Sequence, residues 1–241
     1  MSYTPRRTIK RTERLQGWGL AGQGRWEPYV GELTVGAVLA GRRVAGLVLA
    51  AGEARRFGGA KLLAPLEGRP LVAYALDVAG RARLAGLLSS VAGVVAPGDQ
   101  AVTALVAATG AVAVTNDAPQ RGLSSSLRCG LAALRDADAA LVLLGDQPLV
   151  RLDVVAVLVA AWYEGLGNLI RPRYAASPAE PGHPVLIDRS LWPLVERLEG
   201  DAGLGSLLPA GSPGVALIDV AGQNPDVDSP IDLQSLERSR S

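Results

Sequence analysis

From residue 43 onward, short runs of apolar residues alternate with longer segments whose apolar positions recur at helical spacing. The run Val44–Ala50 is rich in branched residues and ends close to Gly52, which is typical of a strand buried on both faces of a parallel sheet. From Pro70 to Leu84 the spacing predicts a helix, with Pro70 suited to its first turn. The same criteria predict further strands at 91–96, 111–115, 139–144, 169–171, 184–187 and 215–220, and further helices at 101–108, 124–134, 152–163, 191–198 and 231–238.

This alternation indicates the fold class. Strands separated by helices of about 10–15 residues form βαβ units, which place helices on both faces of the sheet. Residues 43–241 are therefore predicted to be a single α/β domain with a three-layer, Rossmann-like, mostly parallel sheet. A chain of 241 residues is long enough for one such domain, and folding can bury roughly 70% of its extended surface.

The first 42 residues do not follow this pattern. Residues 1–14 hold five basic side chains against one acidic side chain, a local charge of +4, which leaves the other 227 residues at −3. Two arginines at 6–7 are followed by no apolar stretch, so a signal peptide is not expected. Residues 1–42 are predicted to be a basic, Gly-rich extension, solvated or loosely docked. A start codon assigned too far upstream would produce the same pattern.

Composition excludes several classes of protein. The chain is 49% hydrophobic and has a net charge of +1, which excludes a disordered chain and a nucleic-acid binder that acts through overall basicity. The single cysteine, Cys129, excludes an intramolecular disulfide framework and a multi-cysteine zinc site, and is expected to be a buried structural thiol. No apolar run approaches the roughly 20 residues of a membrane helix. We expect a soluble, cytoplasmic protein that binds neither nucleic acid nor membrane.

A glycine-rich loop follows the first strand. Gly52, Gly58 and Gly59 lack a Cβ, so backbone N–H groups can approach a phosphate closely, and Arg56 and Lys61 add positive charge. The spacing fits neither the Walker pattern nor the dinucleotide fingerprint. Only two of the 24 basic residues are lysines, which suggests that Lys61 is retained for its compact ammonium, although an exposed lysine needs no special reason.

A second loop of small residues precedes the helix predicted at 124–134. Ser124 is a suitable N-cap for that helix, but capping explains one of the three successive serines at 124–126. Free N–H groups and hydroxyls at a helix start can also bind a base or a phosphate. Capping and ligand binding are both compatible with this segment.

Two further segments carry aspartates that could bind a ligand. Asp146 follows the buried strand at 139–144 and would lie at the active edge of the sheet, where it suits a hard metal ion, although Asp also favours turns. Ser229 and Asp232 have the form of a capping box before the last helix, which leaves Asp226 and Asp228 unexplained. The only histidine, His183, is compatible with a structural loop or with a ligand site.

Taken together, these segments resemble the signatures of the MobA-like nucleotidyltransferases, most closely the molybdenum cofactor cytidylyltransferases. The resemblance rests on Leu-Ala-Ala-Gly at 49–52, Arg-Phe-Gly at 56–58, Lys-Leu-Leu at 61–63, Gly-Leu-Ser-Ser-Ser-Leu-Arg at 122–128 and Gly-Asp-Gln-Pro at 145–148. It extends to Gly-His-Pro-Val at 182–185, Gly-Asp-Ala-Gly at 200–203 and Asp-Val-Asp-Ser-Pro-Ile-Asp-Leu at 226–233. It covers roughly residues 43–233 and implies a nucleotide-diphosphosugar transferase-like fold.

The resemblance implies a role for each matched position. Lys61 and Arg56 would be catalytic, Asp146 and Asp228 would bind Mg²⁺, and His183, Gly182 and Asp201 would face the acceptor. Gly205 stands where family members often have a basic residue that binds the acceptor phosphate, and Arg171 or Arg173 could substitute for it. The nucleotide would be bound by Leu49, Ala50, Ala51, Gly52, Gly58, Gly59, Lys61, Gly122, Ser124, Ser125, Ser126 and Arg128.

The implied reaction transfers CMP from CTP to the phosphate of molybdenum cofactor (a molybdopterin) and releases pyrophosphate. Ala51, where the guanylyltransferases of this group tend to have Gly, and the serines at 124–126 favour CTP over GTP. Alternatives are a guanylyltransferase, another small-phosphate nucleotidyltransferase on the same fold, or a non-catalytic molybdenum cofactor chaperone. The expected partners are the NTP, the pterin cofactor, and a molybdoenzyme or its maturation factor.

Overall fold

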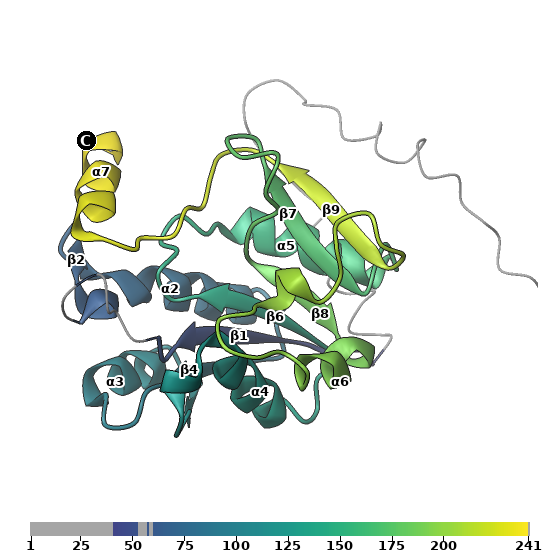
Figure 1. Ribbon diagram of the computed structural model, residues 1–241, viewed down its shortest axis with the longest axis horizontal. Coiled ribbons are helices and arrows are strands. Elements are labelled where there is room, and N and C mark those ends of the chain that lie inside the picture. Colours follow the sequence, from purple (N-terminus) through teal and green to yellow (C-terminus); the bar gives the residue numbers. More distant parts are fainter. Residues whose placement is uncertain (1–40, 53–56, 58–59, 241) are drawn as a thin grey trace, which may run out of the picture.

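A seven-stranded sheet lies at the centre of the computed structural model, which describes residues 41–52, 57 and 60–240 (Figure 1). The strands are ordered β5-β4-β1-β6-β8-β7-β9. β8 pairs antiparallel with both neighbours, and the other pairs are parallel, so the predicted mostly parallel sheet is confirmed. The strands are β1 (Val44–Ala50), β4 (Ser90–Val95), β5 (Val112–Thr115), β6 (Ala139–Leu144), β7 (Leu169–Tyr174), β8 (Val185–Asp188) and β9 (Val215–Val220).

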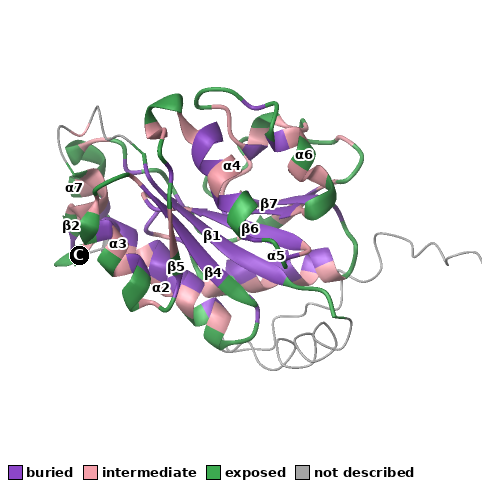
Figure 2. Ribbon diagram, turned by 90° about the horizontal axis from the view of Figure 1, so that it is seen from below, coloured by how far each residue is buried: buried purple, intermediate pink, exposed green. Residues whose placement is uncertain are grey.

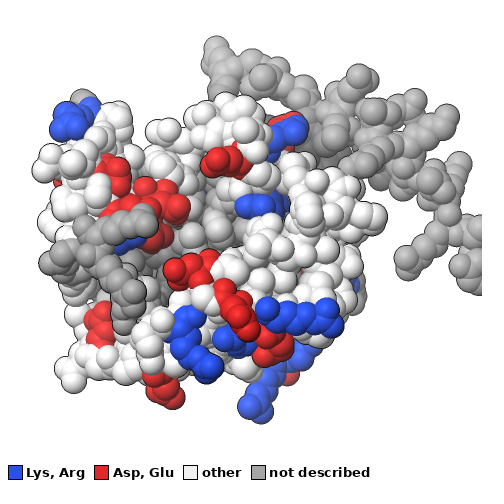
Figure 3. All heavy atoms as spheres, in the orientation of Figure 1, with Lys and Arg blue, Asp and Glu red and all other residues white. Residues whose placement is uncertain are grey.

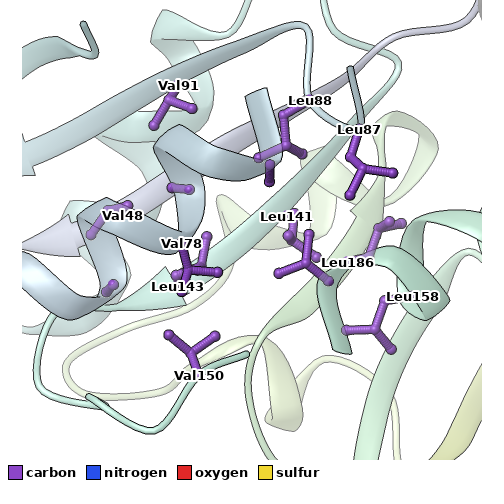
Figure 4. Packing of buried hydrophobic residues seen from close by; sticks show 14 of the residues in the cluster. Val48, Val78, Leu87, Leu88, Val91, Leu141, Leu143, Val150, Leu158 and Leu186 are labelled. Carbon is purple, nitrogen blue, oxygen red and sulfur yellow. The ribbon is translucent and has the colours of Figure 1, made fainter. Parts of the chain in front are cut away.

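Helices cover both faces of this sheet, as Figure 2 shows. One face packs against α2 (Leu71–Leu84), α3 (Gln100–Ala108) and α5 (Leu152–Tyr163), and the other packs against α4 (Leu123–Ala133) and α6 (Trp192–Val195). Successive strand residues point to opposite faces, so β1 contributes Val48 to the first core and Leu47 to the second. Figure 4 shows Val48 beside residues of the first core that come from other elements. The predicted three-layer fold is confirmed.

A small satellite core joins the C-terminal segment to a hairpin that the sequence pattern does not predict. The hairpin consists of β2 (Pro65–Leu66) and β3 (Arg69–Pro70). Leu66, Leu71, Val227 and Leu236 form this core, the last of them from α7 (Pro230–Arg240). It anchors the acidic residues on either side of Val227 next to the segment that follows β1.

Most predicted boundaries agree with the structure to within one or two residues. Strands 44–50, 139–144 and 215–220 and helix 152–163 agree at both ends, whereas strand 169–171 extends to Tyr174 because β9 pairs with its whole length. The helix predicted at 191–198 is present, but it is shorter than predicted. A 3-10 turn, η4 (Arg189–Leu191), leads into α6, which ends at Val195 so that the chain can fold back over the start of α4.

Two further expectations concern the N-terminal extension and membrane helices. Apart from Gly41 and Arg42, the basic extension predicted at 1–42 lies outside the described residues. Within the part of the chain that is described, no helix has both the length and the hydrophobicity needed to span a bilayer.

Candidate active site

The side chains of Lys61, Asp146 and Asp228 meet at the edge of the sheet where β1 and β6 end. Lys61 opens the 3-10 turn η2 (Lys61–Leu63), Asp146 follows β6, and Asp228 precedes α7. Lys61 Nζ lies 2.7 Å from Asp146 Oδ2 and 2.9 Å from Asp228 Oδ1, and 12% of the lysine side chain is exposed. Burial lowers the pKa of Lys61, but the hydrogen bonds and charges of the two carboxylates outweigh burial and the pKa is raised. The ammonium therefore stays charged.

A backbone hydrogen bond and the satellite core hold the segment around Asp228 beside Asp146. The N–H of Val227 donates a hydrogen bond to the carbonyl oxygen of Asp146 at 3.1 Å, and the Val227 side chain is 1% exposed. Asp228 therefore faces away from the satellite core and toward Lys61. The predicted capping box is confirmed, because Asp232 Oδ2 accepts from the N–H of Ser229 at 2.8 Å and Ser229 Oγ accepts from the N–H of Asp232 at 3.3 Å.

Asp226 lies beside this pair in a network of amides. Its Oδ1 accepts a hydrogen bond from Gln147 Nε2 at 2.7 Å, and Gln147 Oε1 accepts one from Asn224 Nδ2 at 3.0 Å. Burial raises the pKa of Asp226, the hydrogen bond from Gln147 lowers it, and the charges of Asp146 and Asp228 raise it again, so the net shift is upward. Asp226 thus adds a third carboxyl group close to the site.

The donor chemistry of Asp146 and Asp228 fits a divalent cation. Their carboxylate oxygens converge on one point, which a positive charge already occupies. Mg²⁺ is typically held by one or two carboxylates and completes its shell with waters and phosphate oxygens. Among the described residues, no group of three or more His, Cys, Asp and Glu is arranged to hold a metal ion. The pair therefore fits an ion shared with a phosphate ligand better than an ion enclosed by protein.

The start of α4 is closed by the chain segment around Gly200. The N–H of Ser124 donates to the carbonyl oxygen of Gly200 at 3.0 Å, and the N–H of Leu123 donates to Asp201 Oδ1 at 3.4 Å. Gly122 is the N-cap, with φ of 85°, and a Cβ there would lie 2.4 Å from the carbonyl carbon of Gly200. The expectation that Ser124 caps this helix is wrong, and two of the N–H groups expected to be free for a ligand are bonded within the protein.

The three serines of α4 differ in their surroundings. Asn116 Nδ2 donates to Ser125 Oγ at 2.8 Å and to Ser126 Oγ at 3.0 Å. Ser124 is fully buried, and its Oγ has no hydrogen-bond partner among the described residues. A buried hydroxyl without a partner is costly in a folded protein, so Ser124 is the serine that a bound ligand would satisfy.

These segments surround a cleft of about 1270 Å³. Figure 3 shows acidic side chains gathered beside a hollow on this face. Arg128 reaches into its wall from α4 and donates to the carbonyl oxygen of Leu198 at 2.6 Å. The residues expected to be functional that line the cleft are Leu49, Ala51, Gly52, Lys61, Gly122, Ser124, Ser126, Arg128, Asp146, Asp201 and Asp228.

Other expected site residues lie elsewhere. Ala50 points into the opposite core because strand residues alternate, and Ser125 bonds to the carbonyl oxygens of Ala118 and Gly122. Asp201, expected on the acceptor side, does line the cleft, but at the start of α4, because the chain after α6 folds back there. Arg56, Gly58 and Gly59 lie outside the described residues.

His183 and Gly182 are not in the lining of the cleft. The carbonyl oxygen of His183 accepts hydrogen bonds from Tyr174 Oη at 2.8 Å and from Asn224 Nδ2 at 3.3 Å. Burial and the charge of Arg171 lower the pKa of the imidazole to about 4, so it is neutral at pH 7. The backbone of this segment braces the network that holds Asp226.

The sequence patterns alone do not reveal several residues that shape the site. Asn116 and Gln147 each follow the carboxyl end of a strand, a position that could have marked them. Glu196 and Glu199, in contrast, reach the cleft only through the turn after α6. Cys129 is partly rather than fully buried; its Sγ donates to the carbonyl oxygen of Thr115 at 3.3 Å, and burial and Asp117 raise its pKa. This environment fits a structural thiol.

Comparison with known proteins identifies relatives that match the chain over different lengths. The chain is 35% identical over 133 residues to the 3-deoxy-manno-octulosonate cytidylyltransferase of Anaeromyxobacter sp. (strain Fw109-5), covering 54% of this chain and 52% of that protein. It is 29% identical over 216 residues to the purine catabolism protein PucB of Bacillus subtilis (strain 168), covering 81% of this chain and 97% of that protein. The chain thus spans about half the length of the cytidylyltransferase and nearly all of PucB.

Solved structures extend the similarity. Rv0371c from Mycobacterium tuberculosis H37Rv superposes with a TM-score of 0.71 at 30% identity, covering 82% of this chain and 98% of that one. A structure of the same protein in complex with manganese has a TM-score of 0.67 at 28% identity, covering 82% of this chain and 99% of that chain. Molybdopterin-guanine dinucleotide biosynthesis protein A from Archaeoglobus fulgidus gives 0.59 at 18% identity, covering 81% and 98%, which supports the fold alone.

The fold and these relatives define a nucleotidyltransferase. The MobA-like NTP transferase domain matches residues 46–214, which is more than half of the chain. The chain belongs to this MobA-like family.

Proposed function

We propose that this protein is a Mg²⁺-dependent cytidylyltransferase that transfers CMP from CTP to the phosphate of molybdenum cofactor. An oxygen of the acceptor phosphate attacks the α-phosphorus of CTP, the bond from that phosphorus to the bridging oxygen of the β-phosphate breaks, and pyrophosphate leaves with the electron pair. The observation that carries the proposal is the convergence of Lys61, Asp146 and Asp228 in a cleft large enough for a nucleotide.

The residues of the chain supply charge and position for this reaction. The ammonium of Lys61 can donate to phosphate oxygens and stabilise the charge that develops at the α-phosphorus. Ser124 offers a buried hydroxyl, and Arg128 places a cation in the wall of the cleft. Mg²⁺ held by Asp146 and Asp228 would offset the repulsion between donor and acceptor phosphates. No covalent enzyme intermediate is required, because positioning and electrostatics suffice for transfers of this type.

Two observations support the choice of substrates. The family signature at 49–52 has Ala51, which favours CTP, and one relative is named as a cytidylyltransferase. The pterin acceptor rests on the sequence motifs that resemble molybdenum cofactor enzymes. Because that relative is named for a sugar acid, 3-deoxy-manno-octulosonate is a second candidate acceptor.

The test is Mg²⁺-dependent release of pyrophosphate by the full chain. CTP, GTP, ATP and UTP are each offered with molybdenum cofactor, and CTP is also offered with 3-deoxy-manno-octulosonate. Asp146→Asn is the control variant, expected to abolish turnover while the far-ultraviolet circular dichroism is unchanged. Arg81→Ala, which removes an ion pair with Asp77 on the surface of α2, is the matched variant that should keep full activity.

Each outcome has a definite meaning. Release with CTP and molybdenum cofactor that is lost in Asp146→Asn supports the proposal. Release with GTP alone overturns the base assignment, and release with the sugar acid alone overturns the acceptor. No release with any nucleotide, together with tight binding of the cofactor, indicates a molybdenum cofactor carrier instead of an enzyme.

A further inference from the structure

Strand β7 carries two arginines whose surroundings differ sharply. Leu169 belongs to the core beneath α4 and α6, and Ile170 to the opposite core. Since strand residues alternate, Arg171 and Arg173 both project from the face of the sheet that carries α4. The cleft uses this same face through Leu49 and Leu144, which line it.

Arg173 is already neutralised. Its Nε lies 2.5 Å from Asp219 Oδ1 and its Nη2 lies 2.8 Å from Asp219 Oδ2, a bidentate pair between neighbouring strands. Such a pair satisfies both the charge and the planar geometry of a guanidinium. Arg173 is therefore not free to bind an anion without losing Asp219.

Arg171 has no such counter-ion. Among the described residues no carboxylate forms a salt bridge with it; its Nη2 donates to the carbonyl oxygen of Pro181, and its buried Nε has no hydrogen-bond partner. Burial lowers the pKa of its guanidinium, and the imidazole beside it, His183, is neutral. A partly buried charge without a partner is costly, so the arrangement calls for an anion from outside the chain.

Gly205 makes room for this guanidinium. A Cβ at position 205 would lie 3.0 Å from Nη1 and 3.1 Å from Nη2 of Arg171, so any other residue there would crowd the guanidinium. Gly205 belongs to η5 (Leu204–Ser206), a few residues after Gly200 and Asp201 in the wall of the cleft. One continuous segment thus runs from the cleft to Arg171.

We propose that Arg171, in the space left by Gly205, binds an oxyanion group of the acceptor at a distance from the reacting phosphate. β8 separates β7 from β6, and strands lie about 4.8 Å apart, so β7 runs roughly 10 Å to the side of β6. Ile170 and Leu141 both pair with Leu186, so Arg171 is level with Val142, which lies about 13 Å before Asp146 along the chain direction of β6. A molecule that reacts beside Asp146 and extends roughly 16 Å, across β8 and back along the sheet, would present a second anionic group to Arg171. This inference rests on the proposed transferase function for the identity of its ligand as the acceptor.

The experiment compares Arg171→Ala, Gly205→Ala and the matched control Arg173→Ala in the full-length protein. KM for molybdenum cofactor and KM for CTP are measured separately by pyrophosphate release. Arg171→Ala should raise the acceptor KM by about tenfold or more and leave the CTP KM within about twofold, because one charge-assisted contact to the acceptor is lost. Gly205→Ala, which keeps the charge but displaces the guanidinium, should change the acceptor KM in the same direction. Arg173→Ala should leave both values near those of the unmodified protein.

An unchanged acceptor KM in Arg171→Ala, or an equal increase in Arg173→Ala, would overturn the proposal. If the unmodified protein releases no pyrophosphate, the transferase function fails and a second measurement decides this inference. Inorganic phosphate should then raise the thermal unfolding midpoint of the unmodified protein and of Arg173→Ala, but not that of Arg171→Ala. Equal stabilisation of all three proteins would contradict an anion site at Arg171.

Discussion

Replacing Lys61 with alanine should tighten the binding of a divalent cation by the nucleotide-free protein while it slows turnover. The Lys61 ammonium occupies the point on which Asp146 and Asp228 converge, so a cation must displace it to use both carboxylates. Without the ammonium, two carboxylates face each other and their repulsion favours a bound cation. The same ammonium stabilises phosphate charge in the proposed reaction, so the two effects have opposite signs.

The size of the binding effect follows from the exposure of the two contacts. The Asp146 side chain is 25% exposed, and a charge-assisted hydrogen bond of this kind contributes about 1.5–3 kcal/mol. The Asp228 side chain is 56% exposed, so solvent screens that contact to about 1 kcal/mol or less. Hydration regained by the released ammonium offsets part of the sum. A net gain of about 1.4 kcal/mol corresponds to roughly tenfold tighter binding.

Manganese titration followed by electron paramagnetic resonance measures this directly, because free Mn²⁺ gives a signal that is lost on binding. Lys61→Ala should bind Mn²⁺ roughly tenfold more tightly than the unmodified protein, and its turnover should fall by roughly 10²-fold. Arg81→Ala removes a cation from a pair on α2 and should change neither value. Equal or weaker Mn²⁺ binding in Lys61→Ala would refute the competition between ammonium and metal, whatever happens to the rate.

Three further predictions test the surroundings of the site. The pKa of His183 is about 4 in the folded protein against 6.5 in the unfolded chain. Between these pH values the unfolded chain binds more protons than the folded protein. The free energy of unfolding therefore decreases as the pH falls from 6.5 to about 4. Urea unfolding at about pH 7.5 and about pH 4.5 measures how much free energy of unfolding is lost between these pH values. The loss should be smaller in His183→Gln than in the unmodified protein, and equal losses would contradict the lowered pKa of His183. Gly122→Ala should lower the free energy of unfolding by about 2–4 kcal/mol, because it places a Cβ 2.4 Å from the carbonyl carbon of Gly200 at a positive φ; an unchanged urea midpoint would show that this turn is not rigid. Ser124→Ala should leave the thermal midpoint unchanged or higher, because it removes a buried hydroxyl that lacks a partner, yet weaken CTP binding by calorimetry; unchanged CTP affinity would exclude a contact from this hydroxyl.

The local pattern of the chain determined which segments become strands and where most of them end. Val44–Ala50 and Ala139–Leu144 are apolar at every position or nearly so, and a strand buried on both faces requires that composition. The pattern also placed Asp146 at the carboxyl end of a strand. In a parallel sheet these ends share one edge, so Asp146 could be assigned to the functional edge before its neighbours were known.

Only the tertiary structure decided which distant groups meet there. Lys61 and Asp228 are 167 residues apart, and their contact depends on the satellite core that fixes Val227. The loop at 200–201 occupies the start of α4 because α6 is short, a feature that its helical spacing does not reveal. Local spacing cannot record such contacts, since they depend on how separate elements pack.

The same distinction applies to the two arginines of β7. By residue type and position, Arg171 and Arg173 are equivalent candidates for an anion site. The pairing of β7 with β9 places Asp219 opposite Arg173, whereas η5 places Gly205 against Arg171. Sequence determined that two cations stand on one face of this strand, and packing decided which of them remained without a counter-ion, because neighbouring strands and turns supply the partners.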